Sequence, residues 1–438
     1  MLRPFLLMMM LLSMTSLVWS REMESPPTDS PRALPSDYNH VQNFLFNTDY
    51  LRSIRELDRP ELRSTVAPAS PWPDSYWPIA KGGLGRRWAD SGFPDVNDWL
   101  ANQTYIVANP PELSFAINRL SPAEKYDLLV GDSSFSLTKK MWAEGQQTYE
   151  KQKKVPLWHG HCHGWAVAAF RDANPQRTVE VNLADGRTLA LYPSDLKALI
   201  SRAWADNKFR KKFVGRRCNV KNPKRDEFGR IIDPDCFEIN PATFHLGLVN
   251  QLGVARKSFV LDVSVGAEVW NHPVHSYQLE YFNPQTFETS EEFAGASVRI
   301  ENFTADKFKR YRSTRVVWVI GVAMTVWYGD VSGPSSKPQN NLKLKSMRLA
   351  YDLELDAKGD VIGGEWYASN RPDFMWHPAP ETRPLAAVEY SAGKIEWNGL
   401  DPVSPAVAAM AREASAKGQV LYGVVEALMN RASLSEDQ

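Results

Sequence analysis

The distribution of apolar and polar residues predicts helices in the first half of the chain and at its end, with strands between them. Amphipathic or capped segments expected to be helical cover residues 37–64, 121–130, 136–152, 193–207, 242–252, 404–417 and 420–432. Alternating or continuous apolar runs typical of strands cover residues 178–191, 258–265, 270–281, 296–302, 315–328, 345–355 and 361–367. The pattern therefore predicts an α+β fold.

Local sequence signals support several of these boundaries. Residues 121–124, Ser-Pro-Ala-Glu, match a capping box with proline at the first helical position. Asp185-Gly186 separates two short apolar runs, as in a β-hairpin. Asn240-Pro241 is expected to begin another helix, which Gly253 ends.

The first residues are typical of a secretion signal. Arg3 precedes an apolar run, Phe5–Trp19, which is too short to span a bilayer and is followed by the small residue Ser20. We therefore expect residues 1–20 to be a signal peptide and the mature protein to be secreted, either extracellular or periplasmic.

Composition divides the remaining chain into three expected parts. Residues 21–70 are a Pro- and Ser-rich leader, which could be a pro-segment over an active site or a flexible tether. Residues 71–400 are expected to form one catalytic domain, and residues 401–438 two C-terminal helices. Basic and acidic residues balance at 51 each, so the net charge does not indicate a nucleic-acid partner.

The chain has 3 cysteines. Cys218 and Cys236 enclose a Pro- and charge-rich segment, and in an oxidising compartment we expect them to form a disulfide. Three free buried thiols are the alternative, which suits the cytosol better. If the disulfide forms, Cys162 is left as an unpaired and reactive thiol.

Cys162 lies in the sequence Leu-Trp-His-Gly-His-Cys-His-Gly-Trp-Ala, residues 157–166. We expect it to begin a buried, alanine-rich helix, whose N-terminus favours a thiolate, beside histidines that could take its proton. This pattern indicates a cysteine nucleophile. An alternative is a zinc site formed by His159, His161, Cys162 and His163. Because adjacent Cys162 and His163 cannot easily reach one ion, we expect no metal ligands.

A cysteine acyl-transfer site needs a base and a group that orients the base. The downstream candidates for the base are His245, His272, His275 and His377. His245 precedes Asp262, which lies on a predicted strand, in the order Cys, His, Asp used by papain-like folds. We therefore predict a catalytic triad of Cys162, His245 and Asp262, although a single helical histidine is often a core residue.

Residues 269–277 read Val-Trp-Asn-His-Pro-Val-His-Ser-Tyr. This sequence resembles the surface peptide of the transglutaminase elicitor family, known from oomycete plant pathogens and also found in bacteria. Further motifs similar to that family surround Cys162 and occupy Phe244–Asn250, Phe259–Asp262 and Gly363–Trp366. The resemblance extends from about residue 72 to residue 378.

The resemblance implies a secreted enzyme with a papain-like core, in which the cysteine helix packs on an antiparallel sheet. It implies Cys162 as the nucleophile and supports His245 and Asp262 as base and orienting group. Trp165 and Trp270 suit a hydrophobic substrate tunnel, although either could be a core residue. His272 and His275 stand where the family has glutamine and a basic residue, which argues against a catalytic role for them.

The expected function is that of a protein-glutamine gamma-glutamyltransferase, which joins a protein glutamine donor to a protein lysine or other amine through a Cys162 thioester. We expect no required cofactor and neither a nucleic acid nor a membrane as partner. A papain-like peptidase or glutamine deamidase could use the same triad. The other alternative is a non-catalytic protein that binds a wall polymer.

Overall fold

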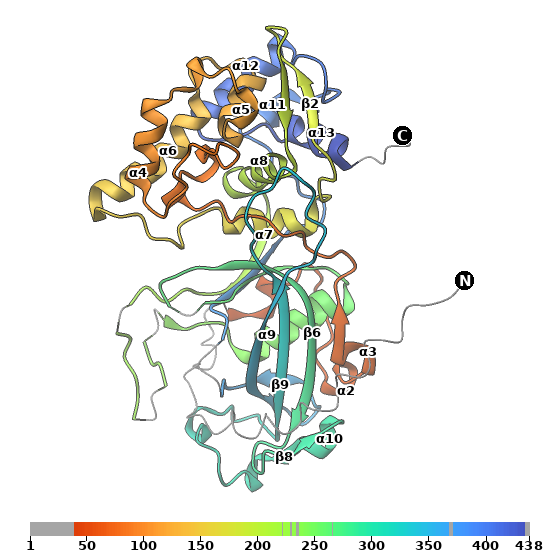
Figure 1. Cartoon of the computed structure of the whole chain (residues 1–438). Coiled ribbons are helices and arrows are strands. Elements are labelled where there is room, and N and C mark those ends of the chain that lie inside the picture. Colours follow the sequence, from red (N-terminus) through yellow and green to blue (C-terminus); the bar gives the residue numbers. More distant parts are fainter. Residues whose placement is uncertain are drawn as a thin grey trace.

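The computed structural model of the chain describes residues 39–433 except 221, 228–229, 234–235, 265 and 368–370. The predicted signal peptide and the first part of the predicted leader lie outside the described residues. A helical half and a half built on an antiparallel sheet meet at helix α7, Cys162–Arg171 (Figure 1). The fold is therefore mixed α+β, as the hydrophobic pattern predicts.

The helical half contains most of the long helices and a separate two-stranded hairpin (Figure 1). Its elements are α4 (Trp99–Ala108), α5 (Pro122–Leu129), α6 (Ser136–Gln152), α7, β2 (Val179–Asn182), β3 (Thr188–Leu191), α8 (Pro193–Asp206), α11 (Glu389–Ala392), α12 (Pro405–Ala416) and α13 (Tyr422–Ser433). The predicted capping box is present, because Ser121 and Glu124 each accept the other's backbone N–H. The hairpin turn also lies at Asp185-Gly186, as predicted.

The other half is built on one antiparallel sheet, which curls as a half-barrel. Within the described residues it has ten strands: β1 (Ser64–Val66), β4 (Lys211–Gly215), β5 (Val260–Asp262), β6 (Asn271–Phe282), β7 (Thr289–Ser290), β8 (Ser297–Arg299), β9 (Trp318–Gly329), β10 (Leu344–Leu355), β11 (Val361–Gly363) and β12 (Phe374–Pro378). Their main order is β11-β10-β9-β6-β5-β12-β4. Helices α9 (Pro241–Leu248) and α10 (Phe293–Ala296) pack on this half, and a π-helical turn, Val249–Val254, follows α9.

Each half has its own hydrophobic cluster. In the sheet half, strand residues such as Tyr277 and Met324 pack with Phe244 of α9. The cluster of the helical half extends onto the sheet, because it includes Val260 of β5 and Trp376 of β12. The two halves therefore share apolar contacts at the level of α7. No helix in the described part of the chain is both long enough and apolar enough to cross a bilayer.

The continuous helix predicted over residues 37–64 is wrong. The described part forms a short 3-10 helix, Val41–Asn43, and two single-turn α-helices, α2 (Ile54–Leu57) and α3 (Pro60–Arg63). Proline at the start of α3 holds the preceding Arg59 in an extended conformation, which ends α2. The segment is nevertheless packed on the sheet half, because Phe44 is buried there and β1 pairs with β6.

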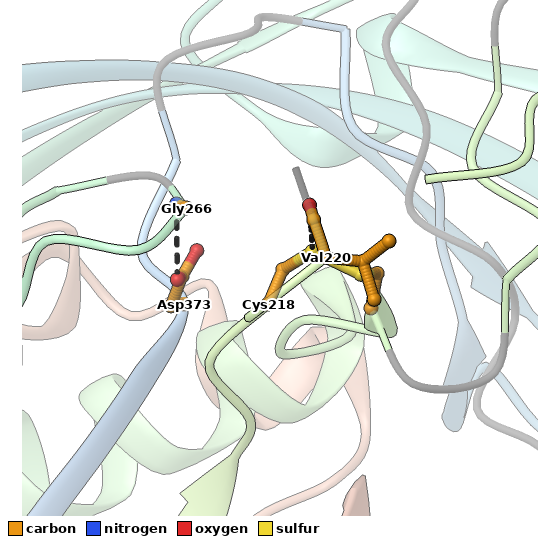
Figure 2. The surroundings of a disulfide bond; sticks show 5 residues. Cys218, Val220, Gly266 and Asp373 are labelled. Carbon is orange, nitrogen blue, oxygen red and sulfur yellow. Dashed lines mark hydrogen bonds between the residues drawn. A yellow bond between two sulfur atoms is a disulfide. The ribbon is translucent and has the colours of Figure 1, made fainter. Parts of the chain in front are cut away.

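Cys218 and Cys236 form the predicted disulfide (Figure 2). The bond joins two points 18 residues apart in the segment between β4 and α9. By the loop-entropy model, such a closure stabilises the fold by about 3 kcal/mol. Figure 2 also shows a neighbouring loop held by a hydrogen bond of 3.2 Å from the Gly266 amide to the carboxylate of Asp373, just before β12.

Helix α7 packs closely between α8 and the sheet strands β5 and β6. A Cβ atom at Gly164 would lie 2.0 Å from the carbonyl oxygen of Ser201 in α8 and 2.9 Å from the Cβ of Ala205. On the next residue, the fully buried Trp165 donates its indole N–H to the carbonyl of Trp72 at 3.3 Å. These contacts fix the position of α7, and with it the residue that begins the helix.

We expect Gly164→Ala to lower the free energy of unfolding by about 3 kcal/mol, because the added methyl group collides with the backbone of α8. Urea-induced unfolding measures this effect. Gly333→Ala is the matched control, since a Cβ there meets nothing within 4 Å. Equal stability of the two variants would show that α7 can move away from α8.

Candidate active site

Cys162 is the first residue of α7, and its thiol lies against the beginning of β6. The residue is 4% exposed. The side-chain amide of Asn271 donates to the sulfur at 3.7 Å, and the carbonyl oxygen of Val269 lies 3.8 Å from it. On the other side, the backbone N–H of His161 donates to the carbonyl of Tyr76 at 2.7 Å. The thiol is therefore held between the start of the helix and the start of β6.

A carboxylate and an amide from adjacent strands meet beside this thiol. Asp262 ends β5, Asn271 begins β6, and the two residues are directly opposite in the antiparallel register. Opposite residues in such a pair direct their side chains to the same face. Asn271 contacts the sulfur, and the negative charge of Asp262 contributes to raising the pKa of the Cys162 thiol. The structure thus places Asp262 opposite the residue that contacts Cys162, so that two of the three predicted catalytic residues lie near each other.

Asp262 is held by hydrogen bonds to one of its two carboxylate oxygens. Oδ1 accepts the backbone N–H of Trp270 at 2.9 Å and the hydroxyl of Ser264 at 2.7 Å. Oδ2 is buried and has no hydrogen-bond partner among the described residues. Burial raises the pKa of Asp262 to about 6, although these hydrogen bonds act in the opposite direction. At neutral pH the group is mostly a carboxylate with one oxygen free to accept a proton.

The Cys162 thiol has a pKa above its ordinary value, mainly because it is buried. The backbone and side-chain N–H groups of Asn271 and the backbone N–H of His163 lower the pKa in part. The helix start alone therefore does not make a stable thiolate here, contrary to the expectation from sequence. The thiol needs a base that accepts its proton when the reaction begins.

Asn271 is a site residue that the sequence reasoning missed. The indole N–H of Trp376 donates to its side-chain oxygen at 2.9 Å, which turns its NH₂ group toward the sulfur. Its position within the motif Val269–Tyr277 was the available signal, because the polar asparagine stands there between Trp270 and a run of strand residues.

His245 lies in the core of the sheet half. It is fully buried in α9, and its Nδ1 atom is 2.8 Å from the hydroxyl of Tyr351 on β10. Its Nε2 atom has no hydrogen-bond partner among the described residues, and burial lowers its pKa to about 3. Since Asp262 is bonded to Ser264 and Trp270 instead, the structure does not bring His245 to the other two predicted triad residues.

The two tryptophans predicted to bind substrate have different surroundings. Trp165 is fully buried in the cluster of the helical half and bonded to Trp72, as in a core residue. Trp270 is partly exposed, and its ring lies 5.2 Å from that of Tyr76 in an edge-to-face arrangement. Only Trp270 is therefore placed where a substrate could contact it.

The histidines around Cys162 do not form a cluster of ligands. His161 is buried, with Nε2 2.7 Å from Arg202 and 3.4 Å from Glu144. His163 has its pKa lowered to about 4 by burial. Within the described ranges, no three His, Cys, Asp or Glu side chains are grouped so that they could hold a metal ion.

The sequence model of the family described as "Transglutaminase elicitor" matches residues 37–395, which is most of the chain. The chain belongs to the transglutaminase elicitor family. Its fold is similar to the crystal structure of the GP42 transglutaminase from Phytophthora sojae, with a TM-score of 0.56 and 20% sequence identity. The match covers 88% of this chain and 94% of the GP42 chain. No curated protein matches the chain significantly in sequence.

In this member of the transglutaminase elicitor family, most of the motif at residues 269–277 forms the first part of strand β6. Residues 271–277 are buried in β6, and only Val269 and Trp270, next to Cys162, are partly exposed. His272 is buried, with Nδ1 2.7 Å from the carbonyl of Gly329 on the neighbouring strand. The stretch therefore positions Asn271 and Trp270 at the site.

We expect Asp262→Asn to lower the pH at which Cys162 becomes half alkylated by iodoacetamide. The substitution removes a negative charge that disfavours the thiolate and keeps an oxygen for Trp270 and Ser264. Below pH about 6 the two proteins should react alike, because Asp262 is then protonated in the wild type. An unchanged or higher midpoint in the variant would contradict this arrangement; His245→Gln should leave the midpoint unchanged.

His245→Gln should make the stability of the protein less dependent on pH. The pKa of His245 is lowered to about 3 in the folded state, whereas in the unfolded chain it is about 6.5. Between these two values only the unfolded chain binds a proton at this residue, so the free energy of unfolding falls as the pH falls below about 6.5. Replacing it should remove about 1 kcal/mol per pH unit from the slope of the unfolding free energy in that range. Urea unfolding at several pH values measures the slope. His40→Gln, at an exposed position, is the control, and an equal change in both variants would contradict the burial of His245.

Proposed function

We propose that the protein is a protein-glutamine gamma-glutamyltransferase with Cys162 as nucleophile and Asp262 as proton acceptor. The observation that carries the proposal is the buried thiol beside a carboxylate with a free oxygen, in a chain of this family. The packing of α7 on an antiparallel sheet is also what a papain-like cysteine core requires, and we include such a core in the proposal.

In the first half-reaction, the sulfur of Cys162 attacks the side-chain amide carbon of a protein glutamine while its proton passes to Oδ2 of Asp262. The tetrahedral intermediate collapses with cleavage of the C–N bond. Asp262 returns the proton to the leaving nitrogen, and ammonia departs. A thioester between Cys162 and the glutamyl group is left.

In the second half-reaction, a neutral amine attacks the thioester carbon and gives a proton to Asp262. Cleavage of the C–S bond then forms the isopeptide bond, and the proton returns to the sulfur of Cys162. Because Cys162 is only 4% exposed, water has little access to its sulfur. This low exposure supports transfer to an amine over the hydrolysis expected of a peptidase or deamidase. The proposed steps use no cofactor.

Backbone and side-chain N–H groups near the sulfur are suited to stabilise the intermediate. The two N–H donors of Asn271 and the backbone N–H of His163 already point to the sulfur. Moving one or two of them onto the developing oxyanion would lower the barrier by about 3 kcal/mol per donor. Trp376 acts as a positioning residue, because it holds the amide of Asn271 in the required orientation.

We propose a structural role for His245 in place of the catalytic role predicted from the sequence. Its buried place beside Tyr351 supports a structural role, and Asp262 takes over the role of proton acceptor. We further propose that the protein acts outside the reducing cytosol. The Cys218–Cys236 disulfide supports this location, since such bonds persist in oxidising compartments.

The direct test is incorporation of a fluorescent primary amine into a glutamine-rich protein by the mature chain, from residue 21 onward. Wild type should label the protein, and Cys162→Ala should give no labelling. Asp262→Asn should reduce the rate by about 100-fold or more, which is the size of a lost general base. His245→Gln should keep the rate within a few-fold. Release of ammonia or of peptide fragments without labelling would contradict the transferase and favour a hydrolase.

A further inference from the structure

A groove of about 490 Å³ lies beside the thiol, at the junction of α8, β4 and β12. Aromatic rings of Phe209, Phe213, Phe374 and Trp376 form much of its wall. Two of these rings, Phe213 and Phe374, are stacked with centroids 4.9 Å apart. Phe213 is 40% exposed, so the groove presents aromatic surface to solvent.

The groove reaches two residues that adjoin the sulfur of Cys162. Asn271 lines it and also donates to the sulfur of Cys162 at 3.7 Å. His163, the neighbour of Cys162 in α7, lines it as well. A chain bound in the groove would therefore lie against the residues that adjoin the sulfur.

The groove carries positive charge and no negative charge. Lys208 and Lys211 line it, and no Asp or Glu is among its described lining residues. The ammonium of Lys211 lies 5.1 Å from the ring centroid of Trp376 and 5.8 Å from that of Phe209. In the described part of the chain, neither lysine forms an ion pair. The whole chain has equal numbers of basic and acidic residues, so this is a local excess.

Strand β4 ends the sheet at this place. In the strand order it pairs with β12 on one side, and no further described strand pairs with its other side. Lys211 and Phe213 are two residues apart on β4, so they share the face that lines the groove. A strand edge without a described strand partner can pair with an extended peptide, and the groove can select that peptide's side chains.

Charge decides which of the two protein substrates fits. An acceptor lysine is a cation and would meet Lys208 and Lys211 without a carboxylate to offset them. A glutamine side chain is neutral, and carboxylates on the residues that flank it would pair with these lysines. Large apolar residues in the same segment would pack on the rings of Phe209 and Trp376.

On the basis of the function proposed above, we propose that this groove and the edge of β4 bind the glutamine donor as an extended protein segment rich in acidic and aromatic residues. The amine acceptor then reaches the thioester by another route. The partly exposed Trp270 and Tyr76 lie near Cys162, outside the described lining of the groove.

The test uses fluorescent peptides with one central glutamine flanked by glutamate and phenylalanine, by serine and phenylalanine, or by arginine and phenylalanine. Fluorescence anisotropy measures their binding to the mature Cys162→Ala protein, so that no chemistry is needed. We expect the acidic peptide to bind about ten-fold more tightly than the serine peptide, the size of two exposed ion pairs of modest strength. The difference should shrink at high ionic strength.

The double variant Lys208→Glu/Lys211→Glu should reverse the preference between acidic and arginine-containing peptides. Lys307→Glu/Lys309→Glu makes the same change of charge at exposed positions outside the groove and should keep the preference. Equal binding of the three peptides, or tighter binding of the arginine peptide to the parent protein, would overturn the proposal. So would an equal loss of preference in both double variants.

The same peptides, given to the protein with Cys162 intact, separate this proposal from the proposed function. Faster ammonia release from the acidic peptide, with labelling by a fluorescent amine, would support both. Labelling of all peptides at equal rates would overturn the donor preference alone. Binding of the acidic peptide without any ammonia release from it would overturn the donor assignment together with the proposed function.

Discussion

The packing of α7 between α8 and the strands β5 and β6 is the constraint on which the site depends. Gly164 lets the helix approach the backbone of α8, and Trp165 fixes its other side through the carbonyl of Trp72. The first residue of α7 is thereby set against the first residue of β6. The helical and sheet halves also share apolar contacts next to α7, so the site lies at the interface between the two halves (Figure 1).

The packing of α7 also determines the burial of the Cys162 thiol, and with it the pKa of the thiol. Burial and the nearby carboxylate raise the pKa of the Cys162 thiol, and burial raises the pKa of Asp262. Cys162 is therefore not a preformed thiolate, and Asp262 is the nearby carboxylate that could take its proton as the thiol attacks. Because Asp262 and Asn271 are paired across β5 and β6, the carboxylate and the amide donor come from neighbouring positions in the sheet. The motif at residues 269–277 contributes side chains to the site. Its pairing in the sheet also fixes where those side chains lie.

The sequence predicted local structure better than it predicted the site. Helix α6 begins and ends where predicted, and the hairpin turns at Asp185-Gly186, because amphipathic spacing and turn chemistry act within a few residues. The disulfide also followed from its spacing and the compartment. His245 and Asn271 show the limit of such reasoning. The order Cys, His, Asp along a chain does not say which strands become neighbours, and only the pairing of β5 with β6 brings Asn271 to the thiol. The position of a residue in space comes from strand order and tertiary packing, and these were not visible in the spacing of residues.

The most direct test of the account is the mass of the acyl-enzyme. The mature protein is mixed with a glutamine peptide in the absence of amine, quenched in acid, and mapped by peptide mass spectrometry. We expect an adduct on Cys162 with the mass of the peptide less ammonia. The adduct should also form in His245→Gln and should be strongly reduced in Asp262→Asn. An adduct that requires His245 and forms normally without the carboxylate of Asp262, or one that forms on a residue other than Cys162, would contradict it.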